Sequence, residues 1–191
     1  MPITEHTFHL IQLTLQKLFL DDSVPKEVRR RILEASVRTP GDWHRDAIMR
    51  AWSSGDRDWM LTAVFAMKYV RGFDDLTLNA LKSSDRQIEY EAVEAAGNWQ
   101  LEAAWPHIAA LVRSPATPKF IRVAAIGAVA SIRPQEAREI LFHLTDSHDE
   151  EIAEAAEEAI ALAITEADLA EFDDEFDDED EEEEDADDWL N

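Results

Sequence analysis

The chain has 191 residues, 46% of them hydrophobic and 31% charged, which is enough for a globular core of ordinary size. Its 42 acidic residues outnumber 18 basic ones, and the absence of Cys excludes disulfides and zinc–thiolate sites. No uncharged apolar stretch reaches the roughly 18 residues of a membrane span, and the N-terminal sequence lacks the pattern of a signal peptide, so we expect a cytoplasmic protein.

The first predicted element is a helix from Thr4 to Leu20. Its large apolar residues recur at helical spacing, which favours one face packed against the rest of the chain. We expect residues 1–24 to form an N-terminal capping helix that shields the first of a series of repeats. The residues on this stripe are Phe8, Ile11, Leu15, Leu18 and Phe19.

From residue 25 onward, five segments share one pattern. Each starts with a large apolar residue and carries small or apolar residues four, seven and eight positions later, which is one face of an α-helix. The position seven residues on is alanine in all five segments, so neighbouring helices can approach closely there. A period of about 31 residues is typical of solenoids built from stacked helix pairs. The segments start at Val28, Trp59, Ile88, Ile121 and Ile152, and the alanines are Ala35, Ala66, Ala95, Ala128 and Ala159.

Shorter second helices are predicted between these first helices. Apolar positions and flanking breakers place them near 42–53, 73–83, 102–113 and 134–145. A last helix over about 150–165 has glutamates on its outer face, as a terminal cap requires. The predicted fold is therefore all-α, an α–α superhelix of about ten helices over residues 1–165.

Two runs of sequence resemble known repeats. FIRVAAIGAVASIRPQEAREILFHLTD (120–146) and IEYEAVEAAGNWQLEAAWPHIAALV (88–112) look like HEAT repeats of the short bacterial type, similar to the HEAT-like repeats of phycobilin lyases. The resemblance covers about residues 25–165 and implies a HEAT-like solenoid. It implies little about function, because such solenoids serve very different roles.

Residues 166–191 form a distinct acidic segment with 17 Asp or Glu and no Lys or Arg. Such a run of like charge predicts a disordered tail. It either keeps the protein soluble or binds a partner through Phe172, Phe176, Trp189 and Leu190, using charge for approach and rings for affinity. One predicted acceptor is the basic run Arg29, Arg30 and Arg31 of the same chain, unless ordinary ion pairs neutralise it.

The sequence contains no P-loop, GxGxxG, HExxH or GxSxG motif, so we expect no catalytic residue, metal or cofactor. Polar residues on second helices, and tryptophans near loop ends, are the candidates for a partner-binding surface. The same tryptophans could instead be packing residues. The candidates are Trp43, Arg45, Arg50, Asp75, Asn79, Trp99, Trp105 and His107.

Together these features favour a non-catalytic scaffold or adaptor that binds another protein through its solenoid surface, with the acidic tail modulating that binding. Two alternatives stay open: an accessory subunit of an enzyme or pigment assembly, lyase-like or chaperone-like, and a polyanion mimic that binds a basic protein through its tail. Residues 1–165 hold 25 acidic and 18 basic residues, a net charge of −7, which argues against direct binding of nucleic acid.

Overall fold

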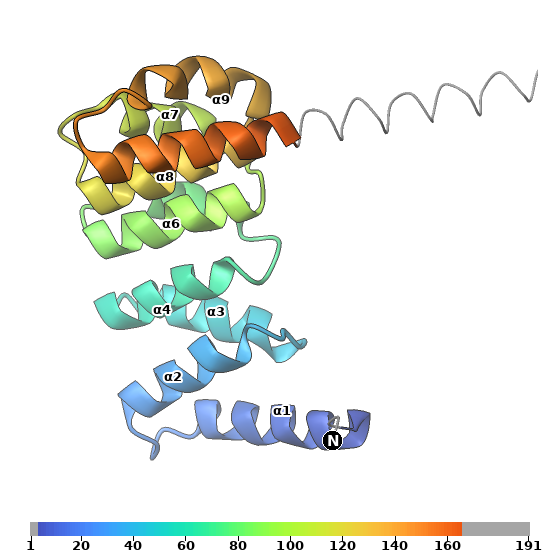
Figure 1. The fold of residues 1–191 in the computed structure, drawn as a ribbon. Helices are drawn as coiled ribbons and strands as arrows, with labels where there is room; N and C mark the ends of the chain where they lie inside the picture. Colours follow the sequence, from blue (N-terminus) through green and yellow to red (C-terminus); the bar gives the residue numbers. More distant parts are fainter. Residues whose placement is uncertain (1–3, 166–191) are drawn as a thin grey trace, which may run out of the picture. The chain divides into compact units, whose positions relative to one another are not determined.

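The computed structural model describes residues 4–165, which form ten α-helices and two short 3₁₀ helices with no strand among them (Figure 1). The chain divides into two compact units, Met1–His107 and Ile108–Asn191. The first unit contains α1 (Glu5–Leu20), α2 (Lys26–Ser36), α3 (Trp43–Ser53), α4 (Arg57–Met67), α5 (Asp74–Ala80), α6 (Arg86–Asn98) and η1 (Glu102–Ala104). The second contains α8 (Lys119–Ile132), α9 (Pro134–Leu141), η2 (Phe142–Leu144) and a last helix over 150–165, and the boundary falls inside α7 (Trp105–Arg113).

The all-α fold and the order of its helices are confirmed. The four second helices, α3, α5, α7 and α9, all lie inside the ranges predicted for them. The hydroxyl of Thr4 accepts a hydrogen bond from the backbone N–H of Thr7, which fixes the start of α1 where the sequence places it. The predicted acidic tail, residues 166–191, lies outside the described residues.

A repeated ion pair joins the starts of successive first helices. Lys26, the first residue of α2, lies 2.6 Å from the Asp56 carboxylate that caps α4. Arg57, the first residue of α4, lies 2.6 Å from Asp85, which caps α6. In the second unit, Lys119 at the start of α8 lies 2.8 Å from Asp149. Each of these carboxylates also accepts a hydrogen bond from a backbone N–H group of its own helix. One side chain therefore both caps its helix and binds the first helix of the preceding repeat.

The alanine that lies seven positions after the start of each repeated segment is buried in four of the five segments. Ala66, Ala95, Ala128 and Ala159 are all at most 5% exposed, as their spacing predicts. In the first segment the prediction is wrong, because Ala35 is exposed and Val28 is 47% exposed. There the buried residues are Leu33, Ser36 and Val37, each one position after a predicted one. A shift by one position rotates the buried face of the helix by about 100° around its axis.

A buried cation links α4 to α6. The side chain of Lys68 is 9% exposed, and its Nζ lies 2.6 Å from Glu91 Oε2 and 3.3 Å from Glu94 Oε2. The ring of Phe65 lies beneath the ammonium group at 4.6 Å. Burial alone would lower the pKa of Lys68, but the hydrogen bonds and charges of Glu91 and Glu94 outweigh it and raise that pKa above its usual value. Lys68 is therefore charged in the folded protein.

A buried histidine ties α3 to the end of α2. His44 is fully buried, and its Nδ1 accepts the backbone N–H of Gly41 at 2.9 Å. Its Nε2 lies 3.0 Å from the hydroxyl oxygen of Ser36, and that hydroxyl donates to the carbonyl oxygen of Ile32 at 2.7 Å. We therefore assign the neutral tautomer with the proton on Nε2. Burial lowers the pKa of His44 below 6.5, because the imidazolium form would be desolvated.

This histidine predicts a loss of stability in weak acid. Because its folded-state pKa is lowered, the stabilisation from neutral His44 is complete above pH 6.5 and is lost as the pH falls through the folded-state value. Urea unfolding from about pH 7.5 to about pH 5 should show the free energy of unfolding decreasing below 6.5. In His44→Gln, which cannot titrate, we expect a shallower decrease over the same interval. An identical pH profile in both proteins would contradict this role for His44.

Candidate protein-binding groove

Two hollows lie next to one another along α1, α3 and α5 of the first unit, and we call them together the second-helix groove. The first, of about 470 Å³, is an open hollow lined by α1 and the start of α3. The second, of about 440 Å³, is also open and is lined by α3, the residues that lead into α5 and the start of α5. Helices α3 and α5 are among the second helices for which the sequence predicts a partner-binding surface, whereas α1 is predicted only as a capping helix.

The first hollow has a wall fixed by hydrogen bonds between α1 and α3. The indole N–H of Trp43 donates to Gln12 Oε1 at 2.9 Å, and Gln12 Nε2 donates to the carbonyl oxygen of Thr39 at 3.1 Å. The ring of Trp43 packs 5.7 Å from that of Phe19. Leu13, 48% exposed, brings an apolar side chain to the opposite side of the hollow. This hollow is therefore preformed, with an apolar contact open to a ligand.

The second hollow is organised around Arg45. Its guanidinium lies 5.2 Å from the ring centre of Phe73 and donates weakly, at 3.4 Å, to the carbonyl oxygens of Arg71 and Gly72. Gly72 has a φ of +88°, and a Cβ there would lie 2.9 Å from the guanidinium, so the residue must be glycine for Arg45 to keep this position. Met49, 43% exposed, supplies the apolar contact of this hollow.

The charges around the second hollow have both signs. Arg45 lies on one side, and Asp74 and Asp75 begin α5 on the other. No described carboxylate forms an ion pair with Arg45. A helix N-terminus favours negative side chains, so the two aspartates are stabilised by the start of α5 without Arg45. The rim can therefore set the orientation of a partner with a complementary charge pattern.

The structure brings together only some of the predicted surface residues. Trp43 lines the first hollow, and Arg45 and Asp75 line the second. Arg50 lines a separate hollow of about 180 Å³ beside Phe19 and Trp59. Asn79 is exposed on α5, and Trp105 and His107 are half-buried in the first turn of α7.

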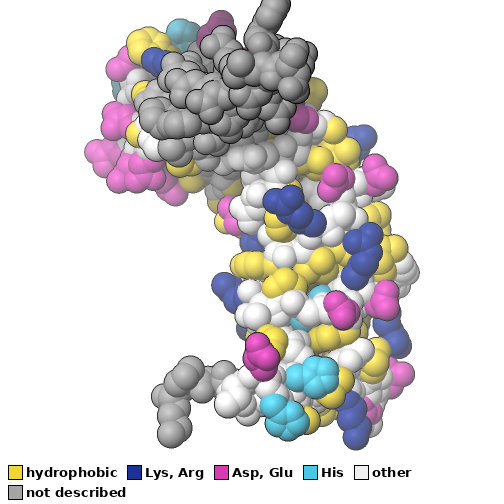
Figure 2. Space-filling view, turned by 90° about the vertical axis from the view of Figure 1, so that its right-hand side faces the viewer, with side chains coloured by type: hydrophobic (Ala, Val, Ile, Leu, Met, Phe, Trp, Pro, Cys, Tyr) yellow, Lys and Arg dark blue, Asp and Glu magenta, His cyan; other side chains and the backbone are white. Residues whose placement is uncertain are grey.

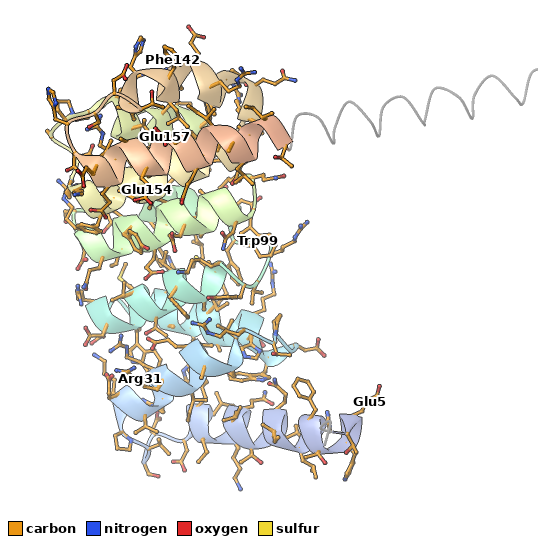
Figure 3. All side chains as sticks on the ribbon, viewed as in Figure 1. Glu5, Arg31, Trp99, Phe142, Glu154 and Glu157 are labelled. Atoms are coloured by element: carbon orange, nitrogen blue, oxygen red, sulfur yellow. The ribbon has the colours of Figure 1, made fainter. Side chains whose placement is uncertain are left out.

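Trp99 has a packing role at the turn after α6. Its indole N–H donates to the carbonyl oxygen of Met67 at 2.7 Å, and its half-buried ring lies at the edge of the first unit (Figure 3). Its assignment as a binding anchor stays a prediction.

Sequence reasoning did not select the apolar residues of the groove. Leu13, Met49 and Phe73 line it, but the prediction considered only polar positions on second helices and tryptophans near loops. The sequence did indicate that Met49 belongs to this surface, because it lies four residues after the predicted residue Arg45 and therefore shares its face of α3.

The basic run at residues 29–31 is already paired with carboxylates. Arg29 forms an ion pair with Asp22, Arg30 with Glu27 and Glu34, and Arg31 with Glu27. The side chains of Arg29 and Arg30 are only 16% and 14% exposed. A contact between these arginines and the acidic segment stays a prediction, and any such contact would have to displace these internal partners.

Two kinds of site are not found among residues 4–165. No group of three or more His, Asp or Glu side chains there is placed to hold a metal ion. No helix in that part of the chain is long and apolar enough to cross a lipid bilayer. Among these residues the groove offers hollows of about 470 and 440 Å³ with apolar side chains at their surface.

Comparison with known proteins identifies the type of repeat. No curated protein matches the chain. Residues 74–161 match the family model of HEAT repeats, a range that starts with α5 and extends into the last helix. The subtype, the short bacterial repeat, stays a prediction. The repeat match and the ordered helix pairs show that residues 74–161 of the chain consist of HEAT-like repeats.

Proposed function

We propose that the chain is a non-catalytic protein-interaction scaffold that binds a segment of its partner in the second-helix groove. The observation that carries this proposal is the pair of adjacent hollows, each with an exposed apolar side chain. HEAT repeats generally serve as protein-interaction scaffolds, which supports binding of a protein over other ligands.

Leu13 and Met49 are the expected apolar anchors. They are 48% and 43% exposed, so the free protein shows both to solvent, and burial by a partner would remove that apolar surface from water. Methionine is enriched at protein interfaces because its side chain adapts to differently shaped partners. A partner segment that fills both hollows must therefore present at least one apolar side chain to each.

The walls of the groove support binding without a large rearrangement. The Gln12–Trp43 hydrogen bond fixes α1 against α3, and Gly72 allows Arg45 to lie over Phe73. Preorganised walls reduce the conformational entropy that binding would otherwise cost. We expect the acidic segment 166–191 to modulate this binding, and the protein to act in the cytoplasm.

The proposal is tested by two charge-introducing variants of the full chain. Leu13→Glu/Met49→Glu places carboxylates in both hollows, whereas Phe142→Glu/Leu162→Glu makes equivalent changes at residues of the second unit that are 65% and 46% exposed. Each protein is used as bait in native lysate, and captured proteins are quantified by mass spectrometry. We expect a partner retained by the wild type and the control to fall about tenfold or more with the groove variant.

Equal capture by all three baits would contradict a role for the groove. A parallel bait consisting of residues 1–165 separates the scaffold from a polyanion mimic. A partner lost with residues 166–191 but kept by the groove variant would mean that the acidic segment, and not the groove, is the binding element.

A further inference from the structure

Three arginines of the first unit lie along the turns that join first to second helices. Arg38 follows α2, Arg45 lies in the first turns of α3, and Arg71 follows α4. All three are exposed, and we call them the arginine edge. Figure 2, which views the molecule from the right-hand side of Figure 1, shows Lys and Arg side chains interspersed with hydrophobic and with Asp or Glu side chains.

Each of these guanidinium groups lies against an aromatic ring further along the chain. Arg38 Cζ is 5.4 Å from the ring centre of Tyr69, Arg45 Cζ is 5.2 Å from that of Phe73, and Arg71 Cζ is 4.7 Å from that of Trp99. Contact with a ring face engages the flat side of a guanidinium and leaves N–H groups at its edge available to a carboxylate. The three groups are therefore held in place before any ligand arrives.

None of the three forms an ion pair with a carboxylate in residues 4–165. In contrast, cations on the first helices do, including Lys26, Arg30 and Arg57. Acidic residues near the edge in sequence, Asp42, Asp46, Asp74 and Asp75, start second helices or lie in their first turn, and they form no ion pair with it. The arginine edge thus presents three guanidinium groups without an ion-pair partner among residues 4–165, although the chain as a whole carries a formal net charge of −24.

We propose that the arginine edge is a docking surface for an acidic peptide segment, and that its occupant is residues 166–191 of the same chain. This segment has 17 carboxylates and no Lys or Arg, together with Phe172, Phe176 and Trp189. A dense acidic run needs no single register to place carboxylates at three guanidiniums. Its 26 residues can span at most about 85–95 Å when fully extended.

The inference goes beyond the proposed function, because it assigns a second surface and its ligand. It also replaces Arg29, Arg30 and Arg31 as the acceptor, since those three already have carboxylate partners. Occupation of the edge would bring the acidic segment beside Arg45, which also lines the second hollow. The acidic segment would then compete with an acidic partner for Arg45, while the apolar anchors Leu13 and Met49 would stay accessible.

The absence of Cys allows a single spin label to be placed in the full chain without altering other residues. Ala186→Cys carries the label within the acidic segment, and paramagnetic broadening of backbone amide signals reports which residues lie near it. We expect broadening at residues 37–42, 68–73 and 99–101. The pattern should be independent of protein concentration and should weaken as salt is raised, because exposed charges are screened.

The decisive comparison uses two variants with the same change of charge. Arg38→Gln/Arg71→Gln removes two members of the edge but keeps Arg45, so the groove is unchanged and the two proposals can fail separately. Lys17→Gln/Lys82→Gln removes two exposed cations that form no ion pair with a described residue. We expect the edge variant to lose the broadening and the control to keep it.

Two results would overturn the inference: broadening at these turns that survives in the edge variant, or no broadening there in the wild type. Broadening that appears only at high protein concentration would overturn the assignment to the same chain. A second variant, with the acidic residues of 173–180 changed to Asn and Gln, leaves residues 4–165 unchanged and must also lose the broadening.

Discussion

Replacing Lys68 by Met should destabilise the protein by about 3 kcal/mol, among the largest effects of any single substitution in the chain. The side chain of Lys68 is 9% exposed and lies between Glu91 and Glu94, whose side chains are 18% and 36% exposed. Without the ammonium group, two carboxylates would share a partly buried site with no cation, and leaving such a charge uncompensated costs several kcal/mol. The measurement is the free energy of unfolding in urea at neutral pH.

The matched control is Lys82→Met, because Lys82 is exposed and forms no ion pair with a described residue. We expect that change to stay within about 0.5 kcal/mol. The double variant Lys68→Met/Glu91→Met should recover part of the loss, since it removes one of the stranded carboxylates. A loss below about 1 kcal/mol in Lys68→Met would contradict the role of this ion group in joining α4 to α6.

Enlarging an alanine of the buried stripe should have a comparable effect. Ala95 has no exposed surface, and it lies on α6, which packs against α4. Ala95→Leu adds three carbon atoms where the helices have no free space, and overpacking of this kind costs typically 1–3 kcal/mol. We expect a loss near the upper end, about 2–3 kcal/mol, measured by thermal or urea unfolding.

Ala110→Leu serves as the control, because Ala110 is an exposed residue of α7. Leucine and alanine both favour helices, so this change should stay within about 0.5 kcal/mol. Equal losses of stability in Ala95→Leu and Ala110→Leu would contradict the account that the repeated alanines are needed because the helices approach closely there.

The fold could be predicted from the sequence because the pattern that lets one helix pack closely on the next occurs five times. Ala66, Ala95, Ala128 and Ala159 are buried as expected, since each faces a neighbouring helix. The prediction for the first repeat was wrong because the position of Val28 in the sequence does not specify how far α2 rotates when it packs against α1 as well as α4. One ion pair between a first helix and the next cap could also have been predicted, because Arg57 directly follows the cap Asp56 and pairs with the next cap, Asp85.

The groove could be predicted only in part. Trp43, Arg45 and Asp75 were selected from their positions on second helices, and the structure places all three beside the two hollows. Leu13 and Met49 were missed because exposure of an apolar residue depends on what packs around it, and sequence spacing alone does not show this. The turn geometry at Gly72, which admits Arg45, likewise depends on two segments 27 residues apart.

The most direct test of the proposed scaffold is site-specific photocrosslinking from the groove. A photoreactive phenylalanine analogue replaces Met49 in the full chain, or Phe142 as a control that is more exposed, at 65% against 43%. Both proteins are irradiated in native lysate, and the adducts are identified by mass spectrometry. We predict that one partner polypeptide is crosslinked from position 49 and not from position 142. Equal crosslinking from both positions, or adducts only from position 142, would contradict binding of a partner in the second-helix groove.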